Sequence, residues 1–449
     1  MNMPTSRAGD QLHAIASKKA ALHLMPVLML IYFMAFIDRT NVGLAKTSLE
    51  ADVGIGAAAY GLGAGIFFLS YALLEVPSNL VMHKVGPRRW IARIAVTWGA
   101  LCAAMMFVQG ETSFYVLRFL LGAAEAGLYP ALMYIVTVWF AQSQRVTMVG
   151  VIYLAVCVAL VLGGPIGGAL MELAGAGDMH GWQWMFLVEG SVTVVLGFGI
   201  LRWLPDKPAD ASWLTPDEAA ILEERAAVHD APAHTTLRGN ARVAFARPFI
   251  LALSAVYFAN QVTSVAIQYN FPSIVENLGL DGPFMVGLVS GSVGLGALAG
   301  VLVVPAVQRR VRNEVRVIAV CSVAGTAVAI GYVLASGPAL RVALIVLASA
   351  FLIGVLPLYW SLAMARMSGL MAAAGLAFIN TVGLLGGFVG PYLYGWAEGS
   401  MGDTGAGYVS FVAFSVVGVL LLPLLRRTVD REDATAAARS REPAPAGRT

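Results

Sequence analysis

The chain has 449 residues, of which 58% are hydrophobic and only 12% are charged, with a net charge of +3. Soluble globular proteins carry about a quarter charged residues, so this composition excludes a soluble domain of this length and predicts a membrane protein. The small net charge gives no indication of a nucleic-acid partner, and we expect none. Cys102, Cys157 and Cys321 lie inside long apolar runs, where we expect small buried side chains and neither a disulfide nor a metal framework.

Apolar runs long enough to cross a membrane recur along the whole chain. A hydrocarbon core of about 30 Å needs about 20 apolar residues per helix. The first run is too long for the core of a cleaved signal peptide, so we interpret it as a first span. The predicted spans are residues 22–46, 56–82, 88–109, 112–139, 145–172, 182–204, 248–276, 283–307, 317–336, 339–366, 370–397 and 405–426. The sequence therefore predicts an all-α polytopic membrane protein with twelve transmembrane helices.

A polar segment between the sixth and seventh predicted spans divides the chain into two halves. Within it, residues 216–228 are helix-forming and predict an amphipathic helix on the cytoplasmic face. Gly61 and Gly287, and likewise Gly164 and Gly390, share one sequence offset, which suggests a duplicated six-helix unit of the kind that transporters use. The predicted parts are an N-terminal tail (1–21), a six-helix bundle (22–204), a linker (205–247), a second six-helix bundle (248–426) and a disordered tail (427–449).

Basic residues are distributed unequally between the two sides of the predicted membrane. Lys and Arg are enriched in cytoplasmic loops of membrane proteins. The loops on one side contain only Lys46 and Arg341 among basic residues, whereas the other side contains most of the rest, including Lys18, Lys19 and Arg145. We therefore predict a multi-pass protein of the cell inner (cytoplasmic) membrane with both termini in the cytoplasm.

Four ionisable residues lie inside two predicted spans, where a charge costs at least about 2.5–3.5 kcal/mol and usually faces a partner or a cavity. Asp38 and Arg39 are adjacent in the first span and point about 100° apart, so one can face the fourth span while the other faces a central cavity. Arg118 and Glu125 share one face of the fourth span but stand about 10 Å apart, too far for a direct ion pair. Each of these two residues therefore needs a partner from another helix or water.

Two interpretations of these charges remain open. The first is a structural ion-pair network that locks two helices together. The second is a transport site in which Arg39, as the cation without an evident partner, attracts an anion while Asp38 and Glu125 bind protons. For Glu75 and Glu189 we expect a gating or helix-packing role near the cytoplasmic mouth rather than proton coupling.

Other motifs give little indication of chemistry. The glycine strings at 61–65 and 294–296 lack the strand–turn–helix context of a nucleotide-binding loop and are typical of close helix contacts. No zinc, haem or nucleophile pattern stands in a suitable setting. We therefore expect no catalytic residue, no metal site, no cofactor other than the proton as coupling ion, and no enzyme.

Taken in order, the motifs resemble the major facilitator superfamily, and within it the anion:cation symporter family. The resemblance covers about residues 24–426. Each motif is weak alone, but together they are specific. They are residues 38–43 (Asp-Arg-Thr-Asn-Val-Gly), 71–79, 86–90 (Gly-Pro-Arg-Arg-Trp), 118–127, 181–184 (Gly-Trp-Gln-Trp), 189–190, 206–208, 213–214, 379–380 and 386–391.

The resemblance implies the major facilitator fold and proton-coupled import of small organic carboxylates such as tartrate, phthalate or sugar acids. It also implies that Arg39 holds the substrate carboxylate, with Tyr71 and Asn380 adding hydrogen bonds from the two halves. Asp38 and Glu125 are then the protonation sites, and Arg118 tunes them. Expected partners are the substrate anion, protons and the lipid bilayer, with the protein as a monomer.

The chain departs from the family pattern in several places. The loop after the second span has His83 and Lys84 where an acid followed by Arg is usual, so gating contacts that depend on that acid cannot be carried over. Leu385 stands near where a second Asn is common. Tyr153 is the one clear polar candidate in the fifth span, which favours a less hydroxylated or aromatic carboxylate.

Two other functions stay open: an exporter or proton antiporter of the same fold, and a non-transporting membrane sensor of the same ligand. Against an antiporter, the Gly-Pro motif at residues 164–168 is one residue short of the usual spacing. Against a sensor, the linker is too small for a convincing output domain.

Overall fold

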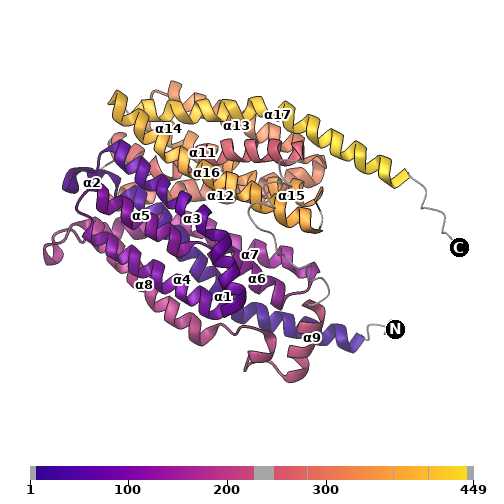
Figure 1. Ribbon diagram of the computed structural model, residues 1–449. Helices are drawn as coiled ribbons and strands as arrows, with labels where there is room; N and C mark the ends of the chain where they lie inside the picture. The colour runs from indigo at the N-terminus through magenta and orange to yellow at the C-terminus, as the bar shows by residue number, and fades with distance from the viewer. Residues whose placement is uncertain (1–6, 227–246, 281, 368, 403, 442–449) are drawn as a thin grey trace. The chain divides into compact units, whose positions relative to one another are not determined.

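A computed structural model describes residues 7–226, 247–280, 282–367, 369–402 and 404–441, and no β-strand occurs within these ranges. Twelve helices in the described chain are long and apolar enough to cross a membrane (Figure 1). The prediction of an all-α protein with twelve spanning helices is confirmed.

The helices of the first half are α1 (Arg7–Leu44), α2 (Lys46–Val53), α3 (Ala57–Val85), α4 (Pro87–Ala104), α5 (Glu111–Glu125), α6 (Leu128–Trp139), α7 (Gln142–Met171) and α8 (Gly181–Trp203), followed by α9 (Pro216–Ala226). Those of the second half are α11 (Pro248–Asn277), α12 (Pro283–Val311), α13 (Glu314–Leu334), α14 (Pro338–Gly354), α15 (Leu356–Met364), α16 (Gly369–Met401) and α17 (Thr404–Arg441). The predicted disordered tail is wrong for residues 427–441, which continue α17; residues 442–449 lie outside the described chain. Helix α1 begins at Arg7, inside the predicted N-terminal tail.

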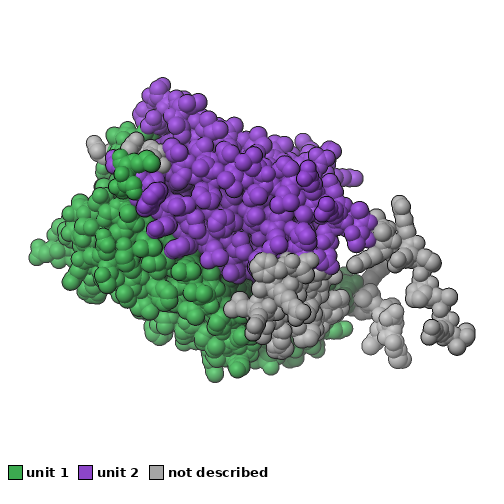
Figure 2. Space-filling view, turned by 45° about the horizontal axis from the view of Figure 1, so that its top comes forward, with its two compact units in different colours: residues 1–230, 268–295, 398–401 green, residues 231–267, 296–397, 402–449 purple. Residues whose placement is uncertain are grey.

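The described chain forms two compact units, coloured separately in Figure 2. Unit 1 comprises residues 1–230, 268–295 and 398–401, and unit 2 comprises residues 231–267, 296–397 and 402–449. In unit 1, α4 packs on α8, α1 on α7, and α3 on α5. In unit 2, α13 packs on α14 and α17, around a core that includes Phe249, Leu253 and Leu362.

Helix α9 confirms the amphipathic helix predicted in the linker, and it packs against α1 and α6 (Figure 1). Thr215 and Glu218 form a capping box: the Thr215 Oγ1 accepts from the Glu218 backbone N–H, and the Glu218 side chain accepts from that of Thr215. Lys19 of α1 donates a hydrogen bond to Glu218 and lowers the pKa of its carboxyl. Trp213 stacks between His23 and Trp139. These contacts hold the start of the linker against the first unit.

Helices α4 and α8 approach so closely that only glycine fits at their contact. A Cβ atom added at Gly190 would overlap the backbone of Gly99 and Ala103 on α4. In the absence of water, packing of this kind is a main source of helix association in a membrane.

We predict that Gly190→Val lowers the free energy of unfolding by about 1–3 kcal/mol or more, because overpacking forces the two helices apart. The measurement is denaturant unfolding in detergent micelles. Gly150→Val is the matched control, since a Cβ at this helical glycine meets nothing within 4 Å. Equal stability of the two variants would show that the α4–α8 contact is looser than described.

Candidate functional site

The fourth span, predicted at residues 112–139, is found at Glu111–Trp139, but its helix is interrupted just after Glu125. Helix α5 ends at Glu125, and Gly127 (φ 91°) takes a left-handed conformation that favours glycine. The Ser78 hydroxyl donates to the Ala126 carbonyl at 2.6 Å, and the Trp90 indole donates to Ser78 at 3.0 Å. Non-helical backbone at membrane depth is tolerated only where protein or water satisfies it, and here Ser78 does so.

Glu125 forms an ion pair with Arg39 of α1. The Glu125 side chain is 1% exposed and that of Arg39 is 17% exposed. The expectation that Arg39 lacks a partner is therefore wrong, whereas the expectation that Glu125 finds its partner on another helix is confirmed. Because Glu125 is the last residue of α5, it stands at the negative end of the helix dipole, which increases its need for a cation.

Three aromatic rings surround the Arg39 guanidinium. Phe36, Phe67 and Tyr71 have their ring centroids 5.1–5.3 Å from its central carbon, within the range of cation–π attraction. We call Arg39, Glu125 and these three rings the Arg39 site. Tyr71 was predicted from the sequence, but Phe36 and Phe67 were not, since phenylalanine in an apolar span gives no separate signal.

A second aromatic cluster adjoins α1. Tyr32 contacts both Tyr129 of α6 and Tyr153 of α7, with ring centroids 5.8 and 6.3 Å away. Tyr32 and Phe36 are also in edge contact, at 5.1 Å. Tyr153, the polar candidate of the fifth span, is thus joined through Tyr32 to the rings of the Arg39 site.

Arg118 is fully buried. It forms no ion pair with Glu125, which agrees with the predicted distance of about 10 Å between the two residues. It donates to the carbonyls of Gly63 and Ala64 on α3 and to the Tyr269 hydroxyl on α11, each at 3.3 Å. The ring of Phe67 lies 4.8 Å from its guanidinium carbon and so touches both arginines. Arg118 is therefore a fixed positive charge behind the Arg39 site.

Asp38 points away from Arg39, toward α4, where Trp98 and Cys102 are its polar neighbours. Neither of its carboxylate oxygens has a hydrogen-bond partner of ordinary geometry among the described residues. Glu189 of α8 accepts a hydrogen bond from Asn41, one turn from Asp38 on α1. Glu189 therefore stands close to the level of Asp38.

The remaining predicted residues lie elsewhere. Glu75 is buried on α3, one turn beyond Tyr71. Asn380 is partly buried on α16 and belongs to unit 2, so the structure does not relate it to the Arg39 site. At the loop after the second span, where the usual acid is missing, Asp206 supplies a carboxylate. It accepts a hydrogen bond from the Arg88 backbone N–H at 3.0 Å, beside Gly86.

Lys46, predicted to lie in a loop, is a buried cation. It pairs with Glu398 and donates to Asn270 at 3.2 Å and to Ser273 at 3.4 Å, all within unit 1. Burial lowers the pKa of Lys46, while Glu398 acts in the opposite direction. The signal that could have indicated this is an isolated lysine at the end of an otherwise apolar span.

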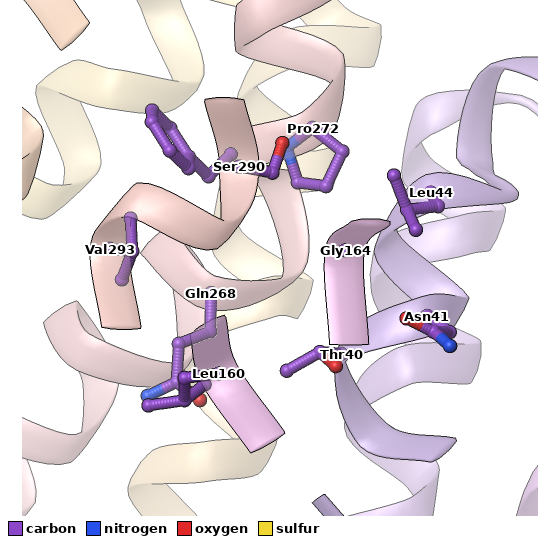
Figure 3. A pocket seen from close by; sticks show the side chains of 10 residues that line it. Thr40, Asn41, Leu44, Leu160, Gly164, Gln268, Pro272, Ser290 and Val293 are labelled. Atoms are coloured by element: carbon purple, nitrogen blue, oxygen red, sulfur yellow. The ribbon is translucent and has the colours of Figure 1, made fainter. Parts of the chain in front are cut away.

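A small cavity in unit 1 is lined by Thr40 and Asn41 of α1, by α7, and by Gln268 and Ser290 (Figure 3). Its volume of about 30 Å³ suits one or two water molecules and is too small for an organic acid. Among the described residues, no group of three or more His, Cys, Asp or Glu could hold a metal ion.

Broken spanning helices beside buried ion pairs are a feature of secondary transporters. Comparison with known proteins agrees: the family model of the Major Facilitator Superfamily matches residues 28–391. The chain belongs to this superfamily, and it is a multi-pass membrane transporter by fold and by relationship.

Individual relatives extend over nearly the whole chain. A protein of Agrobacterium vitis named for tartrate transport is 37% identical over 92% of this chain and 94% of its own length. A quinolone resistance transporter of Acinetobacter baumannii is 33% identical over 91% of this chain and 94% of its own length. Among solved structures, a bacterial homologue of the human lysosomal transporter Spinster, inward-facing and unoccupied, matches with a TM-score of 0.73 and 18% identity, covering 94% of this chain and 98% of its own.

We predict that Tyr269→Phe lowers the free energy of unfolding by about 1.5–3 kcal/mol, because it removes a hydrogen bond to the buried, charged Arg118. Chemical unfolding in detergent provides the measurement. Tyr115→Phe, which removes an exposed bond to Glu111, should change stability by no more than about 0.5 kcal/mol. If Tyr269→Phe leaves the free energy of unfolding unchanged, the hydrogen bond from Arg118 to Tyr269 does not contribute to stability.

Proposed function

We propose that this protein is a proton-coupled importer of small organic carboxylates in the cell inner membrane, working by alternating access. The observation that carries the proposal is the Arg39–Glu125 ion pair, in which the cation is partly exposed and the acid is buried. Arginine is suited to a carboxylate because its planar guanidinium offers paired donors.

Competition for Arg39 supplies the coupling. An arriving carboxylate bonds to the exposed side of the guanidinium and weakens its pairing with Glu125. The Glu125 carboxylate would then be buried without its counter-charge, which costs several kcal/mol, whereas binding a proton removes the charge. Anion binding and proton binding therefore favour each other, and one does not proceed efficiently without the other.

Other residues have supporting parts in this proposal. Arg118 provides a constant positive charge behind the site, and Asp38 is a further protonation site. Tyr71 offers a hydroxyl beside Arg39, and Asn380 offers an amide from the second half of the chain. A substrate must contact both halves for its binding to drive a change between them.

The substrate class rests on two supports. The relative named for tartrate transport favours a carboxylate. The aromatic rings around Arg39 favour a substrate that also has apolar or aromatic surface.

Export is the competing function, because a relative of similar identity is named for quinolone resistance. The two functions differ in the direction of net flux. In proteoliposomes with an acidic exterior, an importer accumulates labelled tartrate or phthalate. An antiporter of the same fold instead expels preloaded substrate when the exterior is the more acidic side.

We predict that Arg39→Lys reduces substrate affinity about 10- to 100-fold, because lysine keeps the charge but loses the paired donors, which are worth about 1.5–3 kcal/mol. Binding is measured by calorimetry on purified protein. Arg309→Lys, at an exposed position at the end of α12, is the matched control and should bind normally. Unchanged affinity in Arg39→Lys would remove Arg39 from the substrate site.

We predict that Glu125→Gln abolishes accumulation of substrate against a gradient but preserves exchange of labelled for unlabelled substrate. Glutamine imitates the protonated carboxyl, so the carrier can reorient when loaded but no longer responds to a proton gradient. Uptake with an imposed pH gradient and counterflow are measured in the same proteoliposomes, with the exposed Glu172→Gln as control. Continued accumulation in Glu125→Gln would place the coupling site elsewhere.

A further inference from the structure

Asp38 and Glu189 are two buried carboxyl groups without an opposite charge beside them. Their exposed fractions are 2% and 3%. Asn41 donates to one oxygen of Glu189, but the other oxygen and both oxygens of Asp38 have no hydrogen-bond donor of ordinary geometry. No ion pair joins either residue to a lysine or arginine in the described chain. Buried carboxylate oxygens without a hydrogen bond are rare in proteins, so we expect a donor such as a bound proton at this place.

Three helices direct the two groups toward one place. Asp38 and Asn41 are three residues apart, so they share a face of α1, and Asn41 bonds directly to Glu189. Cys102 of α4 is close to both acids, and its thiol lies 3.8 Å from the Phe186 carbonyl, one turn before Glu189 on α8. The indole N–H of Trp98, also on α4, has no hydrogen-bond partner in the described chain either, and it is a neighbour of Asp38.

Among the described residues, no neighbouring charged group is available to pair with Asp38 or Glu189. The charged groups that act on Asp38 from adjacent helices are Glu125, Glu189 and Arg118. Glu125 is committed to Arg39, and the Arg118 guanidinium is held by Gly63, Ala64 and Tyr269. Two ionised carboxylates that act on each other through a low-dielectric interior repel each other, and both are poorly solvated. A single proton between them removes both penalties, since the protonated acid donates to the ionised one.

We propose that Asp38 and Glu189 share one bound proton, which makes Glu189 a proton-carrying residue in addition to Glu125. The role of this pair in transport rests on the proposed function above, whereas the shared proton itself does not. The transporter then has two separate proton sites, one that competes with the substrate for Arg39 and one that does not touch the substrate.

A small cavity in unit 1 adjoins Asn41, the hydrogen-bond donor of Glu189. Asn41 lines the cavity of Figure 3, and its carbonyl oxygen has no partner there, while its amide nitrogen bonds to Glu189. The cavity has room for one or two water molecules. Asn41 therefore lies between this cavity and Glu189.

Infrared titration of the purified protein tests the shared proton without any substrate. The wild-type protein should show a protonated buried carboxyl signal at neutral pH. In Glu189→Gln and in Asp38→Asn, the remaining acid gains an amide donor and loses its like-charged neighbour. Its proton should therefore bind at least about tenfold more weakly, and the signal should disappear at a correspondingly lower pH. The exposed Glu111→Gln is the matched control and should leave the signal unchanged.

The proposal is overturned if no such signal exists in the wild-type protein, or if either variant leaves its titration unchanged. If the Asp38→Asn protein does not insert into the membrane, the infrared titration of Glu189→Gln alone tests the proposal. In proteoliposomes, Glu189→Gln should shift the pH dependence of uptake to lower pH. A protein that shows the reciprocal infrared shifts but no proton-driven uptake would contradict the proposed function and support the shared proton.

Discussion

The ion pair between Arg39 and Glu125 is the interaction on which the rest of the site depends. Glu125 is buried at the negative end of α5, where an unpaired carboxylate is strongly disfavoured. Its charge is tolerable only with Arg39 beside it, or with a proton. The same cation is the most exposed charge of the site, so whatever binds it changes what Glu125 requires. A structural ion pair and a transport site are therefore not alternatives here, because one pair can serve both purposes.

The sequence was a good guide to the fold because membrane burial imposes a requirement that composition records directly. Span length and apolar runs predicted all twelve spanning helices, and helix-forming residues in the linker predicted α9. The features that the sequence did not predict are local interruptions or extensions of helices. The break after Glu125 requires Ser78 of α3 to bond the Ala126 carbonyl, and no pattern within the fourth span records that partner. Helical continuation of α17 beyond residue 427 likewise has no apolar pattern to mark it.

Helical geometry predicted part of the site, namely that Arg118 and Glu125 share a face without meeting. It could not decide which helices supply their partners, because this depends on how α1, α3 and α11 are placed beside α5. For that reason the sequence did not predict that Arg39 pairs with Glu125, or that Asn41 bonds to Glu189. Lys46 was missed as a buried group because its partners Asn270 and Glu398 are more than two hundred residues away along the chain.

Proton uptake on substrate binding tests the central claim most directly. Purified protein in weakly buffered detergent solution is mixed with tartrate or phthalate, and a pH indicator follows the proton balance while calorimetry follows binding. The competition between anion and Glu125 for Arg39 predicts uptake of about one proton per anion bound by the wild-type protein, and none by Glu125→Gln. Binding without proton uptake, or equal uptake by the Glu125→Gln protein, would contradict the account.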